Sequence, residues 1–127
     1  MSGTGRRAER VAERIKIELS ELLLRGVVRD PAAADSCVTD VKVSDDLSHA
    51  RVYVRLLRNE VGERAQAAAI DALNRAAGFL RRELSPKLKL KYQPELRFFW
   101  DEGIDRASRI EELLSEIERE GREGTDR

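Results

Sequence analysis

The chain has 127 residues, of which 41% are hydrophobic and 38% are charged, a balance typical of one globular domain. No stretch approaches the roughly 18 apolar residues that cross a bilayer, and the start MSGTGRRAER lacks the apolar run of a secretory signal. We therefore expect a cytoplasmic monomer that has no membrane partner. One cysteine and one histidine exclude an internal disulfide and a zinc-type ligand set, so we expect no metal and no cofactor.

The net charge is zero, but the charges are unevenly distributed along the chain. Residues 72–100 carry seven basic and two acidic side chains, whereas residues 101–127 carry five basic and ten acidic ones. A basic block followed by an acidic tail predicts an electrostatic partner for one surface of the protein.

The first half of the chain predicts a helix followed by a hairpin. Apolar residues recur at steps of three and four from about residue 6 to 25, and Gly26 ends this helix. The stretch CVTDVKVS alternates, with Cys37, Thr39, Val41 and Val43 on one side, and ARVYVRLL alternates in the same way after a turn. The two stretches predict antiparallel strands.

The second half predicts a long helix, a third strand and a final helix. The apolar stripe from residue 63 to 84 continues across Gly78, so we predict a helix bent at that glycine. Ser85 and Pro86 resemble an N-cap and the first position of a short separate turn. The alternation of PELRFFWD places Leu96, Phe98 and Trp100 in the core and leaves Phe99 exposed. RIEELLSEIERE predicts an amphipathic helix.

The predicted fold class is α+β. Helix, strand, strand, bent helix, strand and helix follow one another, and a hairpin plus one strand joined by a helical crossover gives a three-stranded sheet with helices packed on one face. We divide the chain into a flexible lead (1–5), a domain (6–107), and an amphipathic helix with an acidic, flexible tail (108–127).

Several stretches closely resemble the ribosome-binding factor A family, in order and at family spacing. They are RVAERIKIELSELLLR, VRDP, VTDVKVSDDLSHARVYV, LNRAAGFLRREL and PELRFFWDEGIDRASRIEELL. The resemblance covers roughly residues 6–114. It implies a type II K-homology-like domain in which an Ala-x-Gly kink, here Ala76, Ala77 and Gly78, replaces the usual glycine-rich loop. The connector AAADS departs from the basic, glycine-containing connector usual in the family.

The resemblance also implies a function and partners. The family acts on immature 30S subunits rather than 70S ribosomes, binds 16S ribosomal RNA and its precursor, and assists processing of the RNA 5′ end. It matters most in the cold, and a ribosome-dependent GTPase helps to release it. The kink and nearby basic residues would face the RNA.

The candidate RNA-binding residues follow from the kink and the charges. The basic block comprises Arg75, Arg81, Arg82, Lys87, Lys89, Lys91 and Arg97, of which the first six join Ala76, Ala77 and Gly78 as candidates. The three lysines alternate with leucines, so they would share one exposed side if this segment is extended. A second set on the first helix comprises Arg6, Arg7, Arg10 and Arg14.

Structural interpretations compete with these assignments. An isolated glycine such as Gly78 also serves close helix packing, and the first-helix arginines also fit a surface ion-pair network with Glu9 and Glu13. No nucleophile, glycine-rich phosphate loop or histidine pair indicates an enzyme. The alternative function is a noncatalytic protein-interaction module, with the helix Ser108–Glu120 as its docking element and the basic block as the surface for an acidic protein partner.

Overall fold

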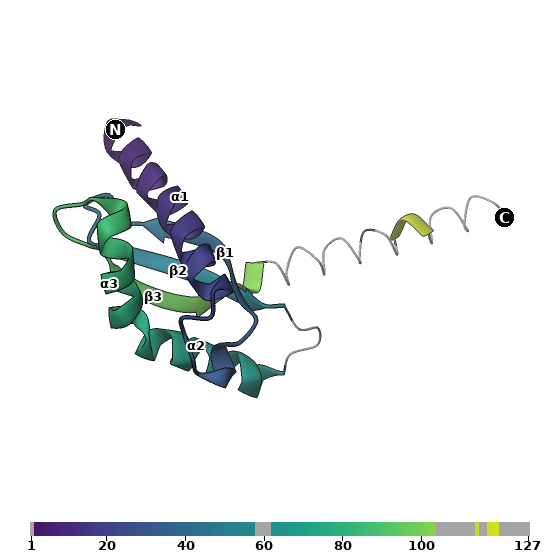
Figure 1. The fold of residues 1–127 in the computed structure, drawn as a ribbon. Helices are drawn as coiled ribbons and strands as arrows, with labels where there is room; N and C mark the ends of the chain where they lie inside the picture. Colours follow the sequence, from purple (N-terminus) through teal and green to yellow (C-terminus); the bar gives the residue numbers. More distant parts are fainter. Residues whose placement is uncertain (1, 58–61, 104–113, 115–116, 120–127) are drawn as a thin grey trace.

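Figure 1 shows the computed structural model of the chain, in which residues 2–57, 62–103, 114 and 117–119 are described. In chain order its elements are α1 (Ser2–Leu24), the short 3-10 helix η1 (Pro31–Ala33), β1 (Ser36–Val43), β2 (His49–Leu56), α2 (Glu63–Arg75), α3 (Ala77–Leu88) and β3 (Glu95–Trp100). The predicted order is confirmed as far as β3. Most of the helix predicted over Ser108–Glu120 lies outside the described residues.

The sheet has β2 at its centre. β1 pairs with it antiparallel and β3 pairs with it parallel, which confirms the predicted hairpin and helical crossover. The helices α1, α2 and α3 cover one face of this sheet (Figure 1). Val52, Val54 and Phe98 are fully buried beneath them, because alternate residues of a strand point to the same face. The aliphatic core therefore lies between the helices and this face.

The predicted alternation along β1 is wrong at Thr39. Val38 pairs with Val54 and Asp40 pairs with Tyr53, so one residue of β1 has no partner in the register. Such a bulge reverses which residues face the core. Val38 consequently packs against the core together with the later valines of the strand.

Trp100 lies outside the buried core, so its predicted position is also wrong. Its side chain is half-buried, and the guanidinium carbon of Arg55 lies 4.7 Å from the ring centroid. β3 ends at this residue, so the helices do not cover it as they cover Phe98.

α1 begins at Ser2, earlier than predicted, because apolar spacing reports only the face that packs on the sheet. That face consists of Ala8, Ala12, Ile15, Leu19 and Leu22. The predicted end at Gly26 is confirmed, since this glycine has a φ of 73°. The Gly26 N–H donates to the Leu23 carbonyl at 3.1 Å. The Val27 N–H donates to the Leu22 carbonyl at 3.4 Å, which completes a Schellman cap.

The predicted bend is present, but the helix breaks at Ala76 rather than at Gly78. Ala76 has φ −86° and ψ −2°, and its N–H donates to the carbonyls of Ala72 and Leu73. Its own carbonyl accepts the N–H of Leu80 at 2.9 Å. Ala76 therefore caps both helices, and Gly78 lies within the first turn of α3.

Pro86 does not start a separate turn, contrary to the prediction. α3 continues through it to Leu88 and ends at Lys89, which has a φ of 53°. A proline so near the end of a helix removes one N–H donor while the remaining turn persists. The segment after Ser85 is thus helical before it turns. It is not extended from Lys87 to Lys91, so the condition under which these lysines would share one side is not met.

Candidate nucleic-acid interface

The junction of α2 and α3 lies beside the free edge of β3. Asn74 joins the two, because its Nδ2 donates to the Phe98 carbonyl at 3.1 Å and its Oδ1 accepts the Phe98 N–H at 2.8 Å. Both edge groups of Phe98 are satisfied by one side chain. The sequence interpretation missed Asn74, although an amide that interrupts the apolar residues of a helix is a recognisable sign of such a contact.

A groove runs between this junction and β3. Its lining residues are Asn74, Ala77, Gly78, Arg81, Glu95, Leu96 and Arg97. A Cβ built on Gly78 would meet only the Arg82 Nη1, at 3.9 Å. The glycine is therefore not needed for helix packing, which contradicts the structural interpretation of it. It leaves the backbone at the start of α3 open to the groove.

The two arginines that follow the kink differ in their surroundings. The Arg81 Nε donates to the Gln93 carbonyl at 3.1 Å, so Arg81 is tied to the loop before β3. Arg82 is exposed and forms no ion pair within the described part of the chain. Arg82 is therefore the more available of the two for an anionic ligand.

Arg75 lies on the other side of the junction. Its Nη2 is 3.0 Å from the Asp30 Oδ2. The pKa of the Asp30 carboxyl is lowered because this group accepts the N–H of Ala32 and, in second place, a hydrogen bond from Arg75. Arg75, which is predicted from the sequence to bind RNA, thus has a partner within the protein.

The three lysines of the basic block are separated. Lys87 Nζ lies 3.4 Å from Glu18 Oε2, so this lysine joins α3 to α1. Lys89 and Lys91 are exposed, and the Lys91 ammonium lies 5.5 Å from the ring centroid of Tyr92.

The arginines of α1 line neither the groove nor the pocket described next. Arg14 forms an ion pair with Glu18 at 3.2 Å. The expected surface ion pairing is therefore present at Arg14, but its partner is Glu18 rather than Glu9 or Glu13. Arg6, Arg7 and Arg10 are exposed.

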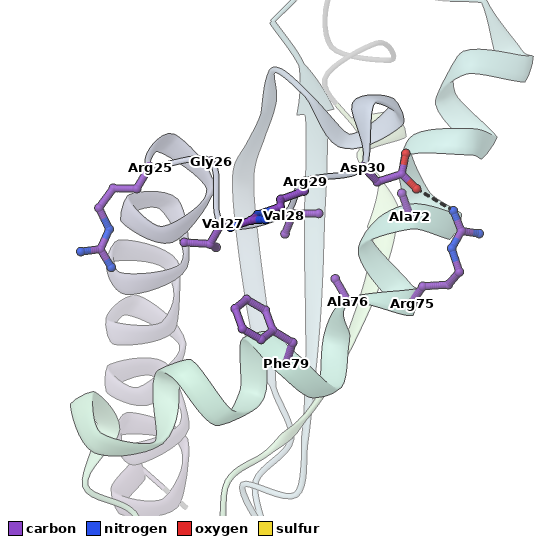
Figure 2. A pocket seen from close by; sticks show the side chains of 10 residues that line it. All are labelled: Arg25, Gly26, Val27, Val28, Arg29, Asp30, Ala72, Arg75, Ala76 and Phe79. Carbon is purple, nitrogen blue, oxygen red and sulfur yellow. Dashed lines mark hydrogen bonds and ion pairs between the residues drawn. The ribbon is translucent and has the colours of Figure 1, made fainter.

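A pocket opens on the side of the junction that Arg75 occupies (Figure 2). Figure 2 shows the Phe79 ring pointing toward Val27 and Val28. Arg25 and Arg29 also line the pocket. Phe79 is 39% exposed. The sequence interpretation did not single it out, although an aromatic residue beside Gly78 and off the apolar stripe indicates an unburied ring.

Metal and membrane sites are not found in the part of the chain that the structure describes. No group of acidic, histidine and cysteine side chains there is arranged to hold a metal ion, and no described helix is long and apolar enough to cross a bilayer. The site offers backbone N–H groups and guanidinium groups, both of which bind anions. Its small side chains leave these groups accessible.

Comparison with known proteins decides the family. The family model described as ribosome-binding factor A matches residues 7–114. The chain belongs to the ribosome-binding factor A family. A ribosome-binding factor A from Sorangium cellulosum is 45% identical over 117 residues, which are 92% of this chain and 93% of that protein.

Solved structures of the family have the same fold. The crystal structure of ribosome-binding factor A from Thermus thermophilus matches with a TM-score of 0.59 and 27% identity, covering 72% of this chain and 93% of that one. A Thermus thermophilus ribosome-binding factor A homology model, fitted into a cryo-electron-microscopy map of its complex with the 30S subunit, matches with a TM-score of 0.50 and 27% identity over 70% of this chain and 93% of that one. The predicted K-homology-like α+β fold is confirmed, and ribosome-binding factor A proteins are noncatalytic assembly factors.

Proposed function

We propose that this protein binds immature 30S ribosomal subunits through 16S ribosomal RNA and assists their late maturation. Membership of the ribosome-binding factor A family supports this proposal, as does the related Thermus protein fitted into a 30S complex. Processing of the RNA 5′ end, importance in the cold, preference for free 30S over 70S particles, release by a ribosome-dependent GTPase and a cytoplasmic location belong to the same proposal.

The observation that carries the proposed contact is the groove at the α2–α3 junction. Gly78 lies there without a side chain, and Arg82 is exposed beside it. The first N–H groups of a helix lack intrahelical partners and carry partial positive charge. An RNA phosphate at the start of α3 would receive these N–H groups together with the Arg82 guanidinium. Binding of this kind reads backbone shape and charge rather than base sequence.

The test is cosedimentation with purified 30S particles. Arg82→Glu should abolish binding, whereas Arg64→Glu, which makes the same charge change at an exposed position of α2, should leave it intact. Across a salt series, Arg82→Gln should reduce the slope of log affinity against log salt concentration by the contribution of about one phosphate contact. Unchanged affinity and salt dependence of both Arg82 variants would exclude the proposed phosphate contact at the start of α3.

The alternative of an acidic protein partner on the basic block stays a prediction, because most of its docking helix, Ser108–Glu120, lies outside the described residues. Nuclease treatment of a pull-down separates the two. Loss of partners after RNA digestion supports the RNA function, and retention of one acidic protein supports the alternative.

A further inference from the structure

Three cations lie in register across the sheet on the face that the helices leave open. Lys42 of β1 pairs with Arg51 of β2, and Arg51 pairs with Arg97 of β3. All three side chains are exposed. Strands lie about 4.8 Å apart, so this sheet-face row places three positive charges within about 10 Å.

No carboxylate forms an ion pair with the sheet-face row within the described residues. The two strand carboxylates on this face are engaged elsewhere. Asp40 accepts the N–H of Val41 at 2.9 Å, and Glu95 lies 3.7 Å from His49 Nε2. Like charges directly opposite one another destabilise a sheet. The repulsion within the row is therefore expected to be relieved when an anionic ligand binds it.

The next register position on this face, two residues along the strands, carries two aromatic rings. Tyr53 pairs with Phe99, and their centroids are 5.8 Å apart with an interplanar angle of 31°. Phe99 is 37% exposed. Tyr53 is half-buried, so Phe99 is the more accessible ring of the pair. An accessible aromatic ring beside a row of cations is the combination that binds single-stranded nucleic acid, since rings stack on bases while cations neutralise phosphates.

We propose that this open sheet face binds a single-stranded RNA segment. Lys42, Arg51 and Arg97 hold its phosphates, and the Tyr53–Phe99 pair stacks on its bases. Duplex RNA is a poorer ligand, because its bases are stacked on one another and offer no free faces to the rings. The inference rests on the proposed RNA-binding function and adds a second surface to it.

The second surface is continuous with the groove at one residue. Arg97 belongs to the sheet-face row and also lines the groove between β3 and α3. An RNA strand that leaves the groove over the edge of β3 therefore reaches the row directly. Tests of the two surfaces should change Lys42, Arg51 or Phe99 on one side and Arg82 on the other, and should leave Arg97 intact.

The experiment measures fluorescence anisotropy of the full chain with a short labelled oligouridylate across a potassium chloride series. The double variant Lys42→Gln with Arg51→Gln should lower the magnitude of the salt slope by about 1.4, since each phosphate contact on a single strand contributes about 0.7. Phe99→Leu, which keeps an apolar side chain, should weaken binding about tenfold through lost stacking and leave the salt slope unchanged. A duplex of the same length should respond little to Phe99→Leu.

Thermal unfolding without RNA supplies the independent readout. The double variant should unfold at the same or a higher temperature than the parent, because it removes repulsion. Arg64→Gln, at an exposed position of α2, is the matched charge control and should change neither measurement. Unchanged oligouridylate affinity in the double variant and in Phe99→Leu would overturn the inference. A lower unfolding temperature with unchanged RNA binding would also overturn it, since the row would then be structural.

The two proposals fail in distinguishable ways. If the Arg82 variants keep 30S binding while the sheet-face variants lose oligouridylate binding, the phosphate contact at the start of α3 is wrong and the sheet-face inference stands. A different result is that the sheet-face variants keep oligouridylate binding but no longer capture a protein that the parent retains in a pull-down after nuclease treatment. The occupant would then be a protein, and the inference would be overturned.

Discussion

Lys87 and Glu18 join the last turn of α3 to the middle of α1, with Nζ and Oε2 3.4 Å apart. Glu18 is only 8% exposed and also receives Arg14 at 3.2 Å. A buried carboxylate is stable only when it is paired and hydrogen-bonded. The basic block of the sequence therefore contains a residue whose charge stabilises the fold.

We expect Lys87→Met to lower the free energy of unfolding by about 1–3 kcal/mol, because it leaves the buried Glu18 with one partner. Lys89→Met, at an exposed neighbouring position, should change it by less than about 0.5 kcal/mol. Urea denaturation measures both. Neither variant should weaken 30S binding as Arg82→Glu does, and a Lys87 variant of parental stability that loses 30S binding would contradict this assignment.

Gly78 separates the packing and binding interpretations of the kink. Gly78→Ala should keep the fold and stabilise α3 by up to about 1 kcal/mol, since the added Cβ meets only the end of the flexible Arg82 side chain, at 3.9 Å. Gly78→Asp should also fold, because a carboxylate is favourable in the first turn of a helix. It should nevertheless lose 30S binding through repulsion of phosphate. Circular dichroism melts measure the stability of both variants, and cosedimentation measures their 30S binding. A Gly78→Ala variant that unfolds would restore the packing interpretation.

Asn74 is predicted to be essential for the edge of β3. Asn74→Leu removes both hydrogen bonds to Phe98 and should lower the free energy of unfolding by about 1–3 kcal/mol. Hydrogen exchange of the Phe98 amide should accelerate relative to that of Val52 in the sheet centre. Arg64→Leu on the same helix is the control. Equal exchange rates at Phe98 in the parent and in Asn74→Leu would show that the side chain does not protect this edge.

Asp46 makes the hairpin turn sensitive to acid. Hydrogen bonds from the Ser48 hydroxyl, the Ser44 hydroxyl and the Ser48 N–H lower the pKa of Asp46 from 3.8 to about 2. A carboxyl whose pKa is lower in the folded state contributes stability that is present above its unfolded pKa and is lost as the pH falls through its folded pKa. The stability that Asp46 contributes should thus decline from about pH 4 toward about pH 2.

Carbon-detected NMR titration of the Asp46 carboxyl measures this pKa directly. Ser48→Ala should raise it toward 3.8, because the largest cause of the shift is removed. Ser20→Ala, on α1, provides a serine control that leaves the turn intact. A titration midpoint of Asp46 near 3.8 in the parent would contradict the hydrogen bonding at this turn.

The amino-acid sequence by itself determined the order of elements as far as β3 and the core face of most of them. Apolar spacing placed Ile15 and Leu19 on one stripe of α1 and located the strands around Val52 and Phe98. Such periodicities are local, because a helix repeats every 3.6 residues and a strand every two. The family resemblance then drew attention to the α2–α3 junction.

Tertiary structure decided which polar groups meet. The sequence pattern did not distinguish Lys87, which pairs with Glu18, from exposed Lys89, and it placed the helix break at Gly78 rather than at Ala76. The bulge at Thr39 and the alignment of Lys42 with Arg51 depend on strand register. Register and partner choice arise from contacts between residues distant in the chain, which local periodicity does not encode.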